Sequence, residues 1–192
     1  MDPYVYPGTN VLKNLRDIRE LEKLAEFEAI ATVRRLVELE RSAVGGKFDM
    51  AHLRSIHRHI FQDVYPWAGE IRTVNISRSG QFPFAFSDRI AGCLETLFSA
   101  LANERFLDGL AAGKFCNRAA FYMGELNAIH PFRDGNGRTQ REFIRQLARR
   151  NGFSLDWTRV TRDQMGEASK LSFQRGDNSG LEEILVRAAV PR

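Results

Sequence analysis

The 192-residue chain contains few cysteines and lacks long apolar runs. Its two cysteines, Cys93 and Cys116, do not have metal-ligand spacing and each sits in an apolar pattern, so we expect buried free thiols in a reducing compartment. No run approaches the roughly 18–20 apolar residues that a membrane helix needs. The first residues, MDPYVYPGTN, also lack the basic and apolar regions of a signal peptide. We therefore expect a cytoplasmic protein with no membrane contact.

Several common site signatures are also missing. There is no GxSxG, CxxC or phosphate-loop GKS/GKT sequence. His52, His57 and His59 are not spaced as HExxH, so we expect core or surface roles for them rather than metal binding. The net charge of +4, carried mostly by arginine, admits nucleic acid or an acidic partner protein. A solvated basic surface explains this composition as well, and we favour it.

Apolar periodicity predicts a mostly helical single domain. Residues 1–14, rich in proline and aromatic residues, are expected to form an extended arm. Asp49 is a good N-cap for the second predicted helix and Ser87 for the third. The predicted helices cover about residues 17–44, 50–64, 88–101, 115–129, 136–150, 161–174 and 180–189. We place the arm and first helix in residues 1–46 and the core in about 47–192.

The pattern changes between Trp67 and Ser87. Residues 71–76 suggest a short strand, residues 78–81 a turn, and the alternating Phe82, Phe84 and Phe86 a second strand. An isolated two-stranded hairpin is marginal unless it packs on other elements. An irregular loop held by its aromatic side chains is therefore a close alternative to the hairpin.

Residues 130–141, HPFRDGNGRTQR, combine a tight turn with several chemically active side chains. Pro131 disfavours helix at His130, which predicts that a helix ends there. Gly135 and Gly137 permit close backbone approaches, and a new helix is expected to begin near residues 135–136. The first N–H groups of that helix would form an anion cradle.

The charged residues of this turn favour a polyphosphate ligand. Arg138 and Arg141 lie in the first two turns of the new helix, where a cation opposes the helix dipole unless an anion binds there. Asp134 could hold Mg²⁺ together with phosphate oxygens, or could be an ordinary N-cap. His130 could act as a general base, or could simply end the preceding helix.

The stretch resembles the full signature of the Fic family, HPFx(D/E)GNGRxxR. Residues 65–69, YPWAG, are similar to the WAG segment of that family, and residues 82–86 fall where its target-docking flap lies. The resemblance extends from about residue 10 to the C-terminal region. It implies a mainly α, Fic-like helical bundle with a small β-hairpin flap, acting as a protein AMP-transferase that uses ATP and Mg²⁺.

The resemblance also implies residue roles. His130 would deprotonate a Tyr, Ser or Thr hydroxyl of a target protein, which would attack the α-phosphorus of ATP. Asp134 would hold Mg²⁺, and Arg141 would bind the γ-phosphate. Asn136 would lie near the α-phosphate. The remaining phosphate-binding residues would be Gly135, Gly137 and Arg138, and the flap residues aligning the target would be Ser79, Gly80, Gln81, Phe82, Pro83 and Phe84.

Many Fic proteins carry an inhibitory helix with the motif (S/T)xxxE(G/N), and this sequence has no Glu followed by Gly or Asn. The resemblance therefore implies a toxin that is blocked by a separate small antitoxin carrying that helix. In the bacterial toxins that the chain resembles, targets include the ATPase subunits of DNA gyrase and topoisomerase IV. Action in the bacterial cytoplasm and delivery into another cell both stay open.

Two other functions remain as alternatives. The same site could transfer another nucleotidyl or phosphoryl group. A basic helical nucleic-acid-binding protein is the second alternative, but it leaves His130, Asp134 and the glycines without a joint purpose. We therefore expect no direct nucleic-acid binding.

Overall fold

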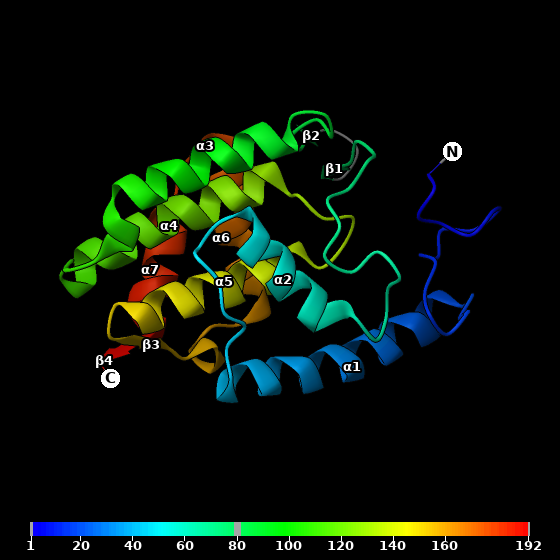
Figure 1. Cartoon of the computed structure of the whole chain (residues 1–192), viewed down its shortest axis with the longest axis horizontal. Coiled ribbons are helices and arrows are strands. Elements are labelled where there is room, and N and C mark those ends of the chain that lie inside the picture. The colour runs from blue at the N-terminus through cyan, green and yellow to red at the C-terminus, as the bar shows by residue number, and fades with distance from the viewer. Residues whose placement is uncertain (1, 79–81, 192) are drawn as a thin grey trace.

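The computed structural model describes residues 2–78 and 82–191 (Figure 1). Within these residues seven α-helices and two small antiparallel sheets are formed. The helices are α1 (Leu21–Arg41), α2 (Met50–Phe61), α3 (Ile90–Asn103), α4 (Ala112–Ile129), α5 (Asn136–Arg150), α6 (Arg162–Arg175) and α7 (Ser179–Ala188). The strands are β1 (Ser77–Arg78), β2 (Phe82–Pro83), β3 (Phe153–Leu155) and β4 (Ala189–Pro191), with short 3₁₀ turns at Arg105–Leu107 and Trp157–Arg159.

The helical prediction is confirmed, with local corrections at two helix starts. The Asp49 carboxylate caps α2 by accepting the His52 N–H at 2.8 Å, as predicted. Ser87 does not cap α3, because the helix begins only after Arg89, which is its N-cap residue and makes no side-chain cap bond. The first helix starts at Leu21 rather than near Asp17, whose φ of 51° places it in the left-handed region.

The predicted hairpin exists but is displaced along the chain. No strand covers residues 71–76; β1 begins at Ser77 and pairs with β2 in the register Ser77↔Pro83 and Arg78↔Phe82. The earlier segment is irregular because its backbone groups bond elsewhere, as with the Arg72 N–H, which donates to Pro131 O at 2.9 Å. The predicted flap residues Ser79, Gly80 and Gln81 lie outside the described residues.

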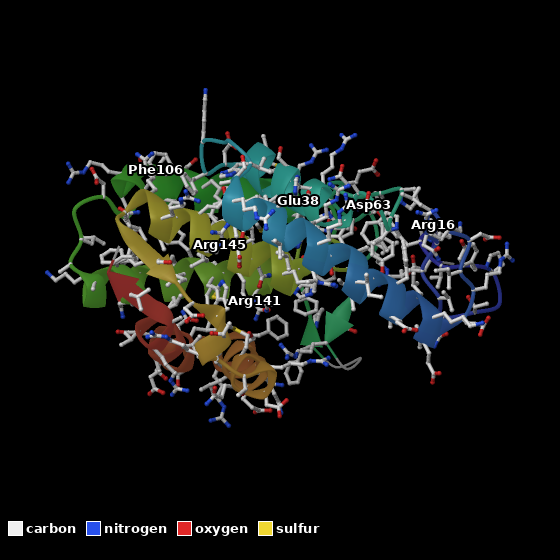
Figure 2. All side chains as sticks on the ribbon, turned by 90° about the horizontal axis from the view of Figure 1, so that it is seen from below. Arg16, Glu38, Asp63, Phe106, Arg141 and Arg145 are labelled. Carbon is white, nitrogen blue, oxygen red and sulfur yellow. The ribbon has the colours of Figure 1, made fainter. Side chains whose placement is uncertain are left out.

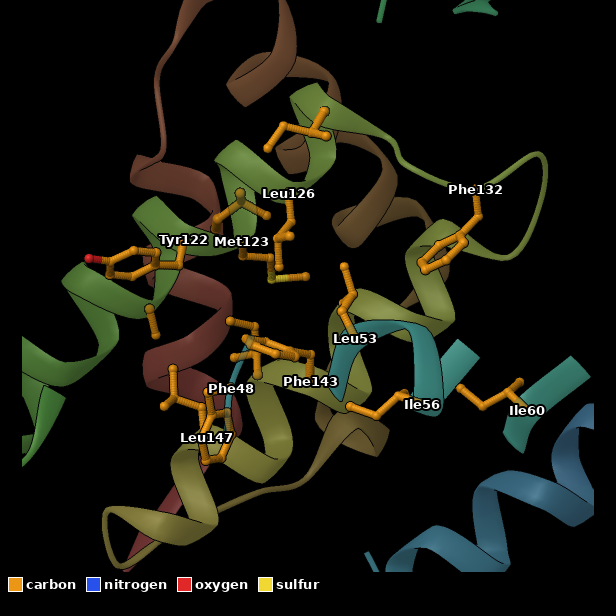
Figure 3. Packing of buried hydrophobic residues seen from close by; sticks show 14 of the residues in the cluster. Phe48, Leu53, Ile56, Ile60, Tyr122, Met123, Leu126, Phe132, Phe143 and Leu147 are labelled. Atoms are coloured by element: carbon orange, nitrogen blue, oxygen red, sulfur yellow. The ribbon is translucent and has the colours of Figure 1, made fainter. Parts of the chain in front are cut away.

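Helix α5 lies at the centre of the fold, packed between α2 and α4 (Figure 1). Its apolar face contributes Phe143 and Leu147, which are fully buried. Side chains of α2 and α4 meet these two residues, as Figure 3 shows for Leu53 and Met123. Because α5 begins at Asn136, inside the 130–141 stretch, its packing against α2 and α4 fixes the position of that turn.

The two cysteines have different environments. Cys116 is buried in α4, as predicted, but Cys93 is exposed. Cys93 lies on the outer side of α3, whose inner face is formed by Ile90, Leu94 and Leu97. The expectation of two buried thiols was therefore wrong for Cys93. Among the described residues, no helix combines the length and the apolar character needed to cross a membrane.

Candidate active site

His130 lies at the C-terminal end of helix α4, at the edge of a cavity. His130 is the C-cap of α4, with φ 50° and ψ 61°, and its N–H donates to Leu126 O at 3.0 Å. This left-handed conformation is uncommon for a residue other than glycine. Pro131 follows at once, so the helix ends where the sequence predicted.

The imidazole of His130 is set up as a neutral proton acceptor. Its Nδ1 lies 3.1 Å from Asn127 O; since a carbonyl only accepts, Nδ1 carries the proton and Nε2 keeps a free lone pair. Phe84 stacks on the ring at 3.8 Å between centroids and 14° between planes. Burial lowers the pKa of His130 to about 4, against the smaller opposing effect of the Asn127 hydrogen bond. The ring is therefore uncharged at neutral pH.

A cavity of about 550 Å³ opens beside this ring. Side chains from the hairpin, α4, α5 and α6 line it, and the charged or aromatic ones are Arg78, Phe84, His130, Arg141 and Arg162. No carboxylate is among its lining residues. A space with one neutral base and three arginines suits an anionic ligand.

Arg141, the last residue of the 130–141 stretch, is one of the three arginines that line this cavity. Within residues 2–78 and 82–191 it forms no ion pair, and Figure 2 shows it toward the middle of the molecule. Burial lowers the pKa of its guanidinium, and the neighbouring charge of Arg138 adds to this effect. A desolvated cation without a partner is costly unless a ligand supplies the negative charge.

Arg138 lies only three residues earlier but has a different environment. Its Nη2 forms an ion pair with Glu28 Oε1 of α1 at 2.5 Å, and its Nη1 donates to Thr32 Oγ1 at 3.2 Å. The guanidinium also lies over the Phe61 ring, 4.6 Å from its centroid. Glu28 in turn accepts a hydrogen bond from Tyr65 OH. Arg138 is thus held against α1 and does not line the cavity.

The residues that connect α4 to α5 are held by close packing and by hydrogen bonds of the Asn136 side chain. Gly135 is the N-cap of α5 with φ 80°, and a Cβ added there would lie 2.2 Å from Phe61 Cζ. The Asn136 side chain accepts from Phe132 N at 2.9 Å and donates to Phe132 O at 2.8 Å. These two bonds hold the turn and fix the orientation of the Asn136 side chain at the start of α5.

Asp134 has the features needed for a magnesium ligand that acts together with phosphate. Its carboxylate is partly exposed, with Arg138 Nη2 3.7 Å away. Burial raises its pKa, and the charge of Glu28 adds to this. Within the described parts of the chain, no three or more His, Cys, Asp or Glu side chains cluster to hold a metal. One carboxylate fits Mg²⁺, which keeps waters and takes its other ligands from phosphates.

The sequence and fold of this chain are similar to those of known proteins. The family model described as Fic/DOC matches residues 47–148. The chain belongs to the Fic/DOC family. The matched residues include 130–141, so the resemblance of this stretch to the Fic signature is confirmed.

Curated relatives carry one activity in their names. The chain is 45% identical to the protein adenylyltransferase VbhT of Bartonella schoenbuchensis, over 97% of this chain and 38% of VbhT. It is 37% identical to the probable protein adenylyltransferase Fic of Escherichia coli, over 97% of this chain and 91% of that protein. The chain thus spans well under half of VbhT but most of the Escherichia coli protein.

Solved Fic structures share the fold closely. BepC, a VirB-translocated effector of Bartonella tribocorum solved with bound AMPPNP, superposes with a TM-score of 0.90 at 28% identity, covering 98% of this chain and 97% of that one. The N-terminal Fic domain of an effector of Bartonella quintana, solved with bound ADP, gives 0.90 at 30% identity, with coverages of 98% and 95%. The predicted helical bundle with a small hairpin is confirmed.

Three supporting residues of the Fic site were not found from the sequence. Glu28 lies on α1, more than a hundred residues from its partner Arg138. His57, fully buried, accepts from Gly69 N at 2.8 Å and donates through Nε2 to Asp134 O at 3.0 Å, which confirms the core role expected for it. Arg72 is enclosed beside the turn. Only the YPWAG segment, which contains Gly69, hinted at this support.

Proposed function

We propose that this Fic domain transfers AMP from ATP to a hydroxyl side chain of a target protein. The observation that carries the proposal is the shared cavity of His130 and Arg141. A neutral base with a free Nε2 lines the same space as a desolvated cation that has no ion pair among the described residues. The names of the curated relatives support this activity. The bound AMPPNP and ADP in related Fic structures support ATP as the substrate.

The proposed reaction follows from these positions. His130 Nε2 would take the proton from a Tyr, Ser or Thr hydroxyl as its oxygen bonds to the α-phosphorus. The bond from that phosphorus to the bridging oxygen breaks, and pyrophosphate leaves. The first N–H groups of α5 and the Arg141 guanidinium would stabilise charge on the phosphate oxygens. When bound through Asp134, Mg²⁺ would neutralise negative charge on the phosphates.

The hairpin would align the target as a flap. Strand addition to such an edge recognises backbone more than side chains. Phe82 is 41% exposed and is free to meet a target, whereas Phe84 is buried against His130 and Phe173. Pro83 lies beside Phe82 in β2, opposite Ser77. We therefore assign target contact to Phe82 and cover of the catalytic ring to Phe84.

Regulation would come from a separate protein. Since the sequence lacks (S/T)xxxE(G/N), we propose that a small antitoxin supplies a glutamate to Arg141 and blocks the γ-phosphate position. The chain would then be the toxin of a toxin–antitoxin pair acting in the cytoplasm. The related structures from Bartonella are translocated effectors, so delivery into a host cell is the competing context.

The test uses purified protein, Mg²⁺ and ATP labelled at the α-phosphate, incubated with bacterial lysate or with purified ATPase subunits of DNA gyrase and topoisomerase IV. A labelled protein band that disappears with His130→Ala is expected. No band, or an equal band with His130→Ala, would overturn the proposal. Label from the γ-phosphate instead would indicate phosphoryl transfer, and stronger labelling from another α-labelled nucleotide would replace AMP by that nucleotide.

A further inference from the structure

Arg72, in the segment between α2 and β1, is buried, and none of the described carboxylates pairs with it. It is 1% exposed and has the largest volume among the fully buried side chains of the described residues. Within the described residues it forms no ion pair. A buried charge is normally compensated by an opposite charge or by a full set of hydrogen bonds. Since the first is missing, its hydrogen bonds indicate what it does.

One group of these bonds holds the catalytic turn. Arg72 Nε donates to His130 O at 2.8 Å and Nη2 to Ile129 O at 3.2 Å. The Arg72 backbone N–H donates to Pro131 O at 2.9 Å. Three consecutive carbonyls around the catalytic histidine are therefore bound by a single residue. Two of them end α4, where the negative end of the helix dipole compensates a cation.

The other group holds both ends of the hairpin. Nη1 donates to Val74 O, three residues before β1, at 2.7 Å, and Nη2 donates to Ala85 O, two residues after β2, at 2.6 Å. The Ala85 N–H also donates to Ala128 O at 3.2 Å. The base of the flap and the end of α4 thus converge on one guanidinium.

The hydrogen bonds of Arg72 constrain the backbone of His130. A left-handed backbone at a residue other than glycine persists only where its surroundings over-determine it. The hydrogen bonds from Arg72 to residues 129–131 provide that constraint. Through Ala85 the same side chain also fixes the neighbouring Phe84, whose ring stacks on the imidazole at 3.8 Å.

We propose that Arg72 is a positioning residue, which fixes the catalytic imidazole of His130 and the base of the target-aligning flap in one geometry. This inference rests on the proposed AMP transfer. Arg72 does not line the cavity and would touch neither ATP nor the target. Its effect is to set the distance between His130 Nε2 and a hydroxyl presented by the flap.

The principal test is Arg72→Lys, which keeps the charge but cannot reach both the turn and the hairpin. Since misplacement by about 1 Å costs on the order of 100-fold in rate, kcat for protein labelling should fall by about that factor. Affinity for ADP, measured with a fluorescent analogue, should stay unchanged because the α5 start and Arg141 are untouched. Arg118→Lys is the matched control: Arg118 pairs with Glu104 at 2.5 Å and lies outside the cavity lining.

A second readout does not depend on transfer. The chain has four histidines, so the imidazole signals of His130 can be assigned by NMR with a His130→Ala spectrum. Arg72→Lys should move the ring signals of His130 and Phe84 together, and Arg118→Lys should not. If the wild type labels no protein, the proposed function fails while this measurement still tests the positioning role.

A milder variant protects the test against misfolding of Arg72→Lys. Asn75 is exposed, and its side chain accepts the Ser87 N–H at 2.8 Å, which pins the same flap base. Asn75→Ala should give a smaller fall in kcat in the same direction, with ADP affinity unchanged. Labelling by Arg72→Lys at the rate of Arg118→Lys, loss of ADP affinity in step with kcat, or full activity of Asn75→Ala would each overturn the proposal.

Discussion

The close approach of Gly135 to Phe61 gives a quantitative test of how the phosphate cradle is built. Gly135 has φ 80°, and a Cβ added to it would lie 2.2 Å from Phe61 Cζ and 2.3 Å from Phe61 Cε2. Phe61 is fully buried and carries the Arg138 guanidinium above its ring, so it has little room to move. The Gly135→Ala substitution therefore meets both backbone strain and a steric clash.

Gly176→Ala separates these two effects. Gly176 has φ 68° as the C-cap of α6, and an added Cβ there meets nothing within 4 Å. Left-handed backbone alone costs an alanine about 1–2 kcal/mol, and that is the destabilisation expected for Gly176→Ala. Overpacking against Phe61 adds about 1–3 kcal/mol, so Gly135→Ala should lose about 2–5 kcal/mol.

Urea unfolding of both variants measures the difference, and ADP binding measures its effect on the site. Gly135→Ala should also weaken ADP binding, because the strain lies at the first N–H groups of α5, whereas Gly176→Ala should not. Adding Phe61→Leu to Gly135→Ala should recover part of the lost stability, with a coupling energy of about 0.5–3 kcal/mol. Equal stability of the two alanine variants, or strict additivity with Phe61→Leu, would refute the clash.

Three further outcomes follow from the charges of the site. Since the pKa of His130 is lowered to about 4, kcat/KM for labelling should be flat from pH 6 to 8 and fall only on the acid side; a midpoint near 6.5 would contradict burial of the ring. The pKa of His57 is lowered to about 3, so the unfolded chain binds more protons below about pH 6.5. The free energy of unfolding should therefore fall as pH drops, by up to about 1.4 kcal/mol per pH unit. A urea unfolding midpoint that is equal at pH 7 and pH 5 would contradict this. Glu28→Gln should free Arg138 to turn toward Asp134, 3.7 Å away, and so weaken Mg²⁺-dependent more than Mg²⁺-independent ADP binding. The exposed Glu26→Gln on the same helix is its control, and equal binding by the two variants would exclude that competition.

The sequence predicted the helices well because each carries an apolar stripe long enough to show its period. The 3₁₀ turns and the β3–β4 pair were missed, since elements of three residues show no periodicity. The strand was expected too early because Ile71, Val74 and Ile76 are β-branched residues typical of strands, while the actual pairing begins at Ser77. Hydrogen bonds to Arg72, rather than a local preference, decide the course of that segment.

Of the site, the sequence predicted the turn and its neighbouring helix ends. It could not predict which groups support them. An arginine in a strand-like pattern is normally exposed, so nothing local marked Arg72 as a buried side chain beside His130. The Glu28–Arg138 pair depends on how α1 packs against α5, which is a property of the whole fold.

The two signature arginines show why local spacing alone was insufficient. Their positions three apart suggested one shared phosphate role, but Glu28 already neutralises Arg138, and Arg141 has no counterpart within the described residues. An incoming phosphate or glutamate therefore gains most at Arg141, where it satisfies a desolvated charge instead of competing for a paired one. Arg138→Ala would leave the nearly buried Glu28 unpaired and lower stability, whereas Arg141→Ala would remove an unpaired cation and leave stability equal or higher. Urea unfolding of the two variants would measure this difference, and ADP binding would measure the effect of each arginine on the site.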